Sequence, residues 1–198
     1  MKKDFVYLAS ASPRRSELLR QIGVPFEARP AAIDEARAPG ETPEHYVARL
    51  AAEKAEAVWA AVADRKPVLA ADTAVVLDGA VLGKPADAAE AAAMLERLSG
   101  RTHRVLTAVA LRTAAGVESA LSASEVRFRA TTAAERLAYC ATGEPFDKAG
   151  GYGIQGHAAV FVEELTGSYS GVVGLPLFET AALLAQCGLG FWLTARAA

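Results

Sequence analysis

The sequence predicts an α/β protein, because the spacing of its apolar residues switches repeatedly between the two-residue period of strands and the 3.6-residue period of helices. Its 198 residues are 52% hydrophobic and 22% charged, which is typical of a folded chain long enough to bury a sizeable core. The sequence has no fixed-period repeat, low-complexity linker or clear domain boundary. We therefore expect one domain over residues 1–198, or two closely fused lobes that share a sheet.

The first predicted element is a buried strand over residues 5–9, which leads through a short turn into a helix. Ser12 and Pro13 are residue types favoured at a helix N-cap and at the first helical position. Arg14 and Arg15 follow in the first turn, where each cation opposes the helix dipole at a cost of about 0.3–1 kcal/mol. We expect this helix start to face an anion. Two solvated surface arginines are the simpler alternative.

The next elements are a strand, an irregular connection, a long helix and a second buried strand. They are predicted at residues 26–29, 30–41, 42–63 and 68–71. Thr42-Pro43 begins the helix, which is rich in alanine, the best helix former. Beyond the second strand, Asp78-Gly79 lies between two apolar runs and predicts a hairpin.

In the second half of the chain, predicted helices and strands again follow one another. Asp87 with Glu90, and Thr132 with Glu135, have the spacing of helix-capping pairs. The helices that they begin are expected to end near Gly100 and residue 141. The remaining predictions are strands at 103–112, 117–128 and 160–163, and a last helix at 176–186.

Two acidic positions have the chemistry of a metal ligand or a general base. Asp72 directly follows the buried strand 68–71, and carboxylates at strand ends often face a cleft in α/β sheets. Asp34 and Glu35 are adjacent carboxylates in the irregular connection before the long helix. The alternatives are a turn cap for Asp72 and ordinary solvated loop residues for the pair.

A lysine and a glycine-rich segment have the chemistry of phosphate and base recognition. Lys84 is a flexible cation on the stiff backbone of Gly-Lys-Pro, which suits a phosphate. Residues 150–156 contain four glycines, which allow a ligand to approach the backbone. Within them, Tyr152 offers a stacking surface and Gln155 an amide. The segment matches neither the phosphate-loop nor the dinucleotide pattern, and a bulged strand or tight turn is the alternative.

Several functions are disfavoured. The formal net charge of −2 gives no reason to expect a nucleic-acid partner, and no apolar run approaches the roughly 20 residues of a membrane span. Cys140 and Cys187 are too far apart for a paired motif, so neither a disulfide framework nor a zinc site is expected. The first residues carry an acid, Asp4, and lead directly into a predicted strand, so we expect no signal peptide and a cytoplasmic protein.

Taken together, the charged residues fit a phosphorylated substrate bridged by a divalent ion. Carboxylates would hold the metal ion and cations would neutralise the remaining phosphate charge. The residues concerned are the carboxylates Glu35 and Asp72 and the cations Arg14, Arg15, Lys54, Lys84 and Lys148. These residues alone identify neither the base nor the bond that is broken.

Six segments resemble the signature sequences of the Maf family of nucleoside triphosphate pyrophosphatases. They cover residues 8–15, 49–55, 71–73, 83–85, 150–156 and 173–177. The resemblance implies a mixed central sheet flanked by helices, with two lobes around a deep cleft, related to the inosine triphosphate pyrophosphatases. It also implies cleavage between the α- and β-phosphates of a nucleoside triphosphate with Mg²⁺ or Mn²⁺, by a homodimer.

The same resemblance assigns roles to individual residues. Asp72 corresponds to the proton acceptor, and together with Glu35 it is expected to bind the divalent ion. The other positions that match the family's substrate pocket are Ser10, Arg14, Arg15, Lys54, Lys84 and Gln155.

Three positions resemble the family members that act on dTTP and UTP. These are Arg14, Thr73 and Gln155, where members acting on 7-methyl-GTP have an aromatic residue, Gln and Glu. The neutral amide of Gln155 can pair with the O4 and N3–H edge of uracil or thymine, whereas a carboxylate would suit guanine. We therefore expect hydrolysis of dTTP, UTP and modified uridine triphosphates. The alternatives are a 7-methyl-GTP pyrophosphatase, a phosphatase, and a non-catalytic nucleotide-binding regulator of septum formation.

Overall fold

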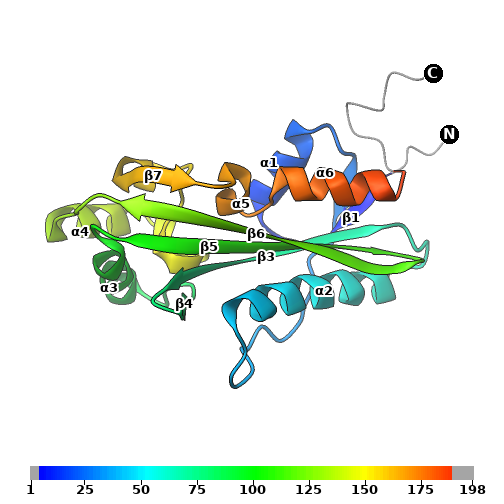
Figure 1. Cartoon of the computed structure of the whole chain (residues 1–198), viewed down its shortest axis with the longest axis horizontal. Coiled ribbons are helices and arrows are strands. Elements are labelled where there is room, and N and C mark those ends of the chain that lie inside the picture. The colour runs from blue at the N-terminus through cyan, green and yellow to red at the C-terminus, as the bar shows by residue number, and fades with distance from the viewer. Residues whose placement is uncertain (1–4, 189–198) are drawn as a thin grey trace.

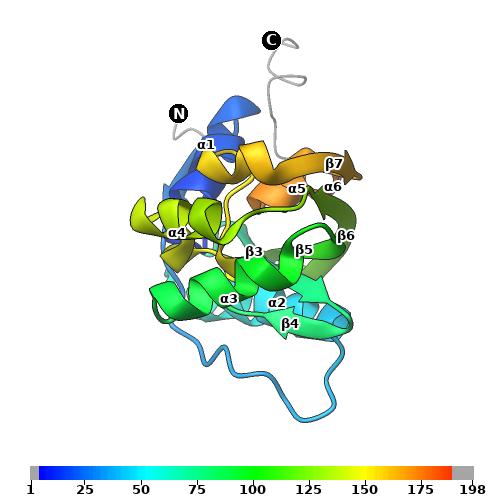
Figure 2. The same cartoon turned by 90° about the vertical axis from the view of Figure 1, so that its left-hand side faces the viewer.

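The structure, a computed structural model, describes residues 5–188 and is built on a mixed sheet with helices on both faces (Figures 1 and 2). Seven strands form the sheet, in the order β2-β1-β3-β5-β6-β7, and β4 also pairs with β3. The strands are β1 Val6–Leu8, β2 Phe26–Ala28, β3 Val68–Leu77, β4 Ala80–Leu82, β5 Thr102–Thr113, β6 Gly116–Phe128 and β7 Val162–Thr166. The predicted α/β class, with a mixed sheet between helices, is confirmed.

The helices lie on both faces of the sheet and at one of its ends (Figure 1). They are α1 Pro13–Gln21, α2 Pro43–Ala61, α3 Ala88–Leu98, α4 Ala133–Ala141, α5 Tyr169–Val173 and α6 Leu177–Gln186. Helix α2 covers one face, α1, α5 and α6 cover the opposite face, and α3 and α4 pack at the far end. Three 3-10 turns, η1 Glu144–Asp147, η2 Ala149–Gly151 and η3 His157–Phe161, occupy much of the glycine-rich region. Every helix within residues 5–188 is too short or too polar to span a bilayer.

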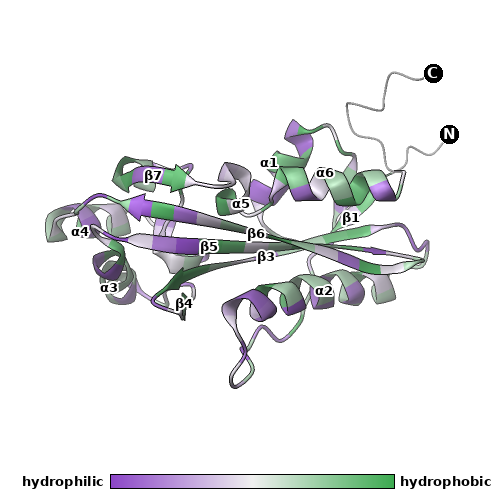
Figure 3. Ribbon diagram, viewed as in Figure 1, coloured by the Kyte–Doolittle hydropathy of each residue, from purple (hydrophilic) through white to green (hydrophobic). Residues whose placement is uncertain are grey.

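Apolar residues follow the sheet and the helix faces turned toward it (Figure 3). One hydrophobic cluster joins α2 to β3 and β5, a second joins β1 and β3 to α1 and α6, and a third joins the other end of the sheet to α3 and α4. The long strands β3 and β5 contribute to all three clusters, so they fix the positions of the helices that pack around the sheet.

Strand β1 pairs with β2 and β3 in parallel, and the other pairings are antiparallel. On the side of β3 opposite β5, β1 pairs with Val68 and Leu69, and β4 pairs with residues 75–77. Among the described residues, no strand pairs with residues 70–74 on that side. The sheet therefore has a gap in the middle of one edge of β3.

Several local predictions are confirmed. Asp78 and Gly79 form the hairpin turn with φ values of 51° and 77°, as the mirror-image type I turn requires. Thr132 and Glu135 form a reciprocal capping box at the start of α4. Thr42 and Asp87 each accept a hydrogen bond at a helix start.

Other predictions were wrong in detail. The strand that was expected to end before Asp72 continues to Leu77, because β5 pairs with it without a break from Val68 to Val76. Ser12 precedes α1, but its side chain makes no capping hydrogen bond; instead its backbone N–H donates to Ser10 Oγ. The last strand was predicted to begin at residue 160, but it begins at Val162, because η3 occupies the residues before it.

Replacing Gly150 by alanine should destabilise the fold. Its φ is 70°, and an added Cβ would lie 2.9 Å from three side-chain atoms of Val75 in β3. Because the overpacking adds to the backbone strain, we expect a loss of about 1–3 kcal/mol in urea denaturation. Gly83→Ala is the control, since nothing lies within 4 Å of its Cβ position. Equal stability of the two variants would contradict this account.

Candidate functional site

A pocket of about 280 Å³ lies at the gap in the edge of β3. Successive residues of a strand point to opposite faces of its sheet. Asp72 therefore points toward α2, and Thr73 toward α1 and α5, yet both line the same pocket. The gap allows this, because β3 has no neighbouring strand there to separate its two faces.

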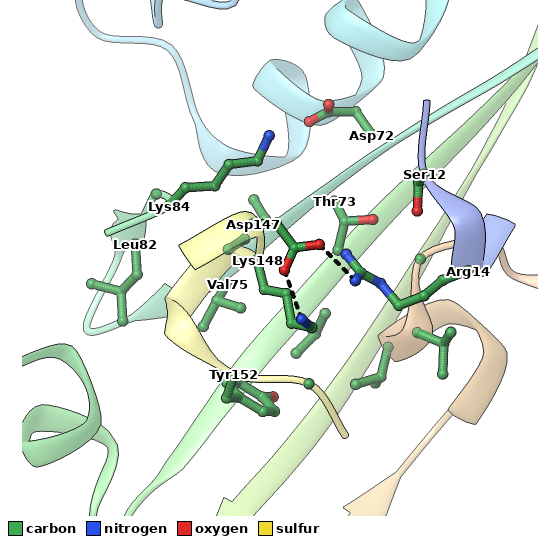
Figure 4. A pocket seen from close by; sticks show the side chains of 18 of the residues that line it. Ser12, Arg14, Asp72, Thr73, Val75, Leu82, Lys84, Asp147, Lys148 and Tyr152 are labelled. Atoms are coloured by element: carbon green, nitrogen blue, oxygen red, sulfur yellow. Dashed lines mark hydrogen bonds and ion pairs between the residues drawn. The ribbon is translucent and has the colours of Figure 1, made fainter. Parts of the chain in front are cut away.

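The pocket brings together most of the residues that the sequence singled out. Asp72 and Lys84 lie at one end, Tyr152 lies at the other, and Asp147 lies between them (Figure 4). The predicted site residues that line it are Arg14, Arg15, Glu35, Lys54, Asp72, Thr73, Lys84 and Gln155. Ser10 lines an adjoining hollow that shares both arginines, Glu35, Lys54 and Lys84 with the pocket.

Lys54 joins the two predicted metal-binding carboxylates. Its Nζ lies 2.7 Å from Asp72 Oδ1 and 2.6 Å from Glu35 Oε1. The side chains of Lys54 and Asp72 are each only 10% exposed, whereas that of Glu35 is 49% exposed. Asp72 is thus a buried carboxylate whose charge is balanced mainly by one buried cation.

Burial and neighbouring charge act in opposite directions on the two carboxyl groups. Burial raises the pKa of Asp72 above its ordinary value, although Lys54 and Arg15 oppose the rise. Burial also acts to raise the pKa of Glu35, but the hydrogen bond from Lys54 and the charges of Lys84 and Arg15 outweigh it and lower that pKa. Asp72 is therefore more basic than an ordinary aspartate, and Glu35 is less basic than an ordinary glutamate.

Arg15 forms hydrogen bonds to three segments around the pocket. Its Nε donates to the carbonyl of Gly174 at 2.8 Å, and its two Nη atoms donate to Ser10 Oγ at 3.3 Å and Thr73 Oγ1 at 3.2 Å. The planar fork of a guanidinium can serve such separated acceptors, whereas a lysine cannot. Arg15 therefore ties the turn before α1 and the end of α5 to β3.

The buried Thr107 extends this connection, which the sequence did not reveal. Its hydroxyl lies 2.7 Å from the carbonyl of Gly171 and 3.0 Å from Thr73 Oγ1. Because a carbonyl can only accept, Thr107 donates to Gly171 and accepts from Thr73. Arg15, Thr73 and Thr107 thus form one chain of hydrogen bonds across the sheet.

Arg14 and Lys148 share a carboxylate that the sequence analysis also missed. Asp147 Oδ2 lies 3.0 Å from Arg14 Nη1, and its Oδ1 lies 2.6 Å from Lys148 Nζ (Figure 4). Nothing in the local sequence relates Asp147 to Arg14, which precedes it by 133 residues. Within residues 5–188, Lys84 makes no hydrogen bond or ion pair, so it is the most available cation of the pocket.

The far end of the pocket is apolar. Its lining includes Val75, Leu82, Val105, Tyr152, Ile154 and Val172. Tyr152 was expected to offer a stacking surface, but it is 5% exposed and its hydroxyl lies 2.7 Å from His103 Nε2. Its ring packs edge-on against His103 and Phe128, so it supports the wall instead of presenting a free face.

The carboxylates of the pocket fit a metal ion only in part. Among residues 5–188, no group of three or more His, Cys, Asp or Glu side chains could hold an ion by itself. Mg²⁺ commonly binds through one or two carboxylates together with substrate phosphates and water. Asp72 and Glu35 meet that requirement, because they share Lys54 and both line the pocket.

Comparisons with known proteins find similar sequences over nearly the whole chain. The dTTP/UTP pyrophosphatase of Aromatoleum aromaticum is 55% identical over 197 residues, which cover 92% of this chain and 95% of the relative. The proteins of that name from Burkholderia pseudomallei and Cupriavidus pinatubonensis are 58% and 56% identical, over 94% and 95% of this chain and 95% and 99% of the relatives. A solved structure of a nucleoside-triphosphatase / dITP/XTP pyrophosphatase from Mycobacterium abscessus shows only a distant likeness, with 20% identity and a TM-score of 0.40 over 62% of this chain and 72% of its own.

A family profile also matches this chain, over almost all of the residues that the structure describes. The sequence profile of the Maf-like proteins matches residues 5–187, from β1 to the end of α6. The chain therefore belongs to the Maf-like protein family.

Proposed function

We propose that the protein is a nucleoside triphosphate pyrophosphatase that hydrolyses dTTP, UTP and modified uridine triphosphates to the monophosphate and pyrophosphate. The observation that carries the proposal is the gap in β3, where one pocket holds clustered cations, two linked carboxylates and an apolar end. Relatives at 55–58% identity that are named dTTP/UTP pyrophosphatases support the same substrates. Such an activity would remove unwanted nucleotides from the nucleotide pool.

The charged end of the pocket suits the triphosphate. Arg14, Arg15, Lys54 and Lys84 would stabilise the charge that builds up on the phosphates and on the departing pyrophosphate. Water would attack the α-phosphorus, and the bond from that phosphorus to the oxygen bridging it to the β-phosphate would break. The leaving group is pyrophosphate.

Asp72 is proposed as the base that accepts the proton of the attacking water. Its raised pKa makes it a better proton acceptor than an ordinary carboxylate, while Lys54 keeps it charged. With Glu35 it would hold Mg²⁺ or Mn²⁺, which when bound would neutralise charge on the phosphates. Ser10 and Thr73 would act through Arg15, whose guanidinium they orient.

The apolar end would receive the base. Gln155 lines the pocket beside Ile154 and Gly153, and its amide would pair with the O4 and N3–H edge of uracil or thymine. We further propose that the chain works as a single domain within a homodimer in the cytoplasm, where its nucleotide substrates occur. The continuous sheet supports the single domain.

A pyrophosphate-release assay tests the proposed function directly. It compares dTTP, UTP, CTP and 7-methyl-GTP in the presence of Mg²⁺ or Mn²⁺. We expect turnover of dTTP and UTP with release of pyrophosphate. Release of inorganic phosphate would indicate a phosphatase, and a preference for 7-methyl-GTP would indicate the other subfamily. Nucleotide binding without turnover would indicate a non-catalytic regulator.

Asp72→Asn should lower kcat by about 10²–10⁴-fold, the usual contribution of a general base. The amide keeps the shape of the side chain, so the melting temperature and circular dichroism should indicate an intact fold. Asp78→Asn, at the exposed hairpin tip, is the matched control and should keep its activity. Near-normal turnover by Asp72→Asn would remove Asp72 from the catalytic role.

Lys54→Met should destabilise the protein more at alkaline than at mildly acidic pH. Removing the cation leaves Asp72 buried without its partner, and breaking such a pair costs about 3 kcal/mol. Loss of Lys54 should raise the pKa of Asp72 further above its value in the unfolded chain. Folding then takes up a proton, so the variant should regain stability as the pH falls through the raised pKa.

Urea denaturation at pH 8 and pH 5.5 measures this difference. Arg97→Met, on the exposed face of α3, removes the same charge and is the control. If Lys54→Met were equally destabilised at both pH values, Lys54 would contribute by packing and not by charge.

A further inference from the structure

Glu144, in the 3-10 turn η1, accepts hydrogen bonds from one end of a short segment of the glycine-rich region and is linked to the other end through Tyr139. Its Oε2 lies 2.9 Å from the backbone nitrogen of His157 and 2.8 Å from Nδ1 of the same residue. Its Oε1 lies 2.8 Å from the hydroxyl of Tyr139, which in turn accepts from the backbone N–H of Gly153 at 3.2 Å. One carboxylate thus connects Gly153 with His157.

Two glycines make room for this carboxylate. A Cβ at Gly156 would lie 2.4 Å from both carboxylate oxygens of Glu144, and a Cβ at Gly153 would lie 3.2 Å from one of them. The φ of Gly156 is −109°, which any residue can adopt. Close approach of Glu144, not backbone conformation, therefore accounts for the glycine at this position.

The Glu144 side chain is only 14% exposed, and its hydrogen bond from Tyr139 is partly buried, whereas its hydrogen bonds with His157 lie at the surface. Although burial acts to raise its pKa, the hydrogen bonds from His157 and Tyr139 hold the pKa of Glu144 below its usual value. A charged acceptor makes stronger hydrogen bonds than a neutral one. Glu144 is therefore a firm anchor for the segment.

Gln155 lies between the two anchored ends and lines the pocket. Residues 152–156 belong to no helix or strand. Within the segment, the backbone hydrogen bond from Gly156 to Gly153 closes the turn, but it does not attach the turn to the rest of the protein. Glu144 and Tyr139 supply hydrogen bonds that make this attachment, and Ile154 adds apolar packing against the core.

The attachment matters because a glutamine amide is not selective by itself. Its oxygen accepts and its NH₂ group donates, so a half-turn of the amide exchanges pairing with uracil for pairing with cytosine. Selectivity therefore requires a backbone that holds the amide at a fixed distance and angle from the base, so that the pairing with one of the two bases is favoured.

We propose that Glu144 is a positioning residue that holds the Gly153–His157 segment and thereby gives Gln155 its selectivity for uracil and thymine over cytosine. This inference rests on the proposed function. Glu144 acts through Gln155 and touches neither the phosphates nor the reacting atoms.

Glu144→Gln tests the inference in the full-length protein. The amide has almost the same shape but only one accepting oxygen for the donors that Glu144 serves. We expect the ratio of kcat/KM for UTP to that for CTP to fall by about tenfold or more, since small misplacements of a positioning group are costly. Glu96→Gln, the same change in an exposed ion pair, should leave the ratio unchanged.

Gly156→Ala approaches the same contact from the opposite side. Its added Cβ must push Glu144 away, so it should lower the same ratio without removing any polar group. A purely structural role would lower the melting temperature and reduce turnover of UTP and CTP equally. That result, or an unchanged ratio in both folded variants, would overturn the inference.

Amide hydrogen exchange provides a measurement that needs no turnover. In Glu144→Gln, the amides of residues 153–157 should exchange at least several-fold faster than in the wild type, while those of β3 and β5 stay protected. Unchanged exchange in that segment would refute the anchoring role even if selectivity changed. If the wild type hydrolysed none of the nucleotides, the proposed function would fail, and the exchange experiment would still decide whether Glu144 holds the segment.

Discussion

The site depends on a charged side chain in the middle of a buried strand. Asp72 is 7% exposed, and an unpaired carboxylate at such a position would be neutralised or would destabilise the fold. Lys54, which lies on α2, prevents this because its Nζ donates a hydrogen bond to Asp72 Oδ1 at 2.7 Å. The position of α2 on the sheet, the charge of Asp72 and the placing of Glu35 are therefore parts of one arrangement, which Lys54 holds together.

The packing of α2 explains why Lys54 reaches Asp72. Lys54 belongs to the same buried stripe as Val47, Ala51 and Val58, which pack on β3 and β5. Because apolar neighbours fix the helix, the Lys54 side chain leaves α2 on its buried face and reaches Asp72. Opposite it, the gap between β1 and β4 leaves room for a ligand beside Asp72. The apolar core thus places the cation, and the interrupted edge of the sheet provides access.

Local sequence patterns were sufficient where a structure depends on neighbouring residues. The hairpin at Asp78-Gly79 and the capping box of Thr132 with Glu135 are fixed by backbone geometry within a few residues, and both were predicted. Asp72 was placed at a strand end because a charge within a central strand is unusual, and only the partner Lys54 makes it stable there. Asp147 and Thr107 could not be found in this way, since their partners Arg14 and Thr73 lie 133 and 34 residues away. Tyr152 was assigned a stacking role from its residue type, whereas His103 and Phe128 enclose its ring.

The ion pairs of the pocket divide into two kinds, according to their burial. The pair of Lys54 with Asp72 is almost completely shielded from water, so separating its charges would be costly. The pair of Arg14 with Asp147 includes a carboxylate that is 61% exposed, and exposed pairs contribute only about 0–1 kcal/mol. An entering phosphate can therefore replace Asp147 on Arg14 at little cost, while the group around Asp72 keeps its geometry. A site of this kind can exchange its anionic partner at the entrance without disturbing the buried charges on which the proposed chemistry depends.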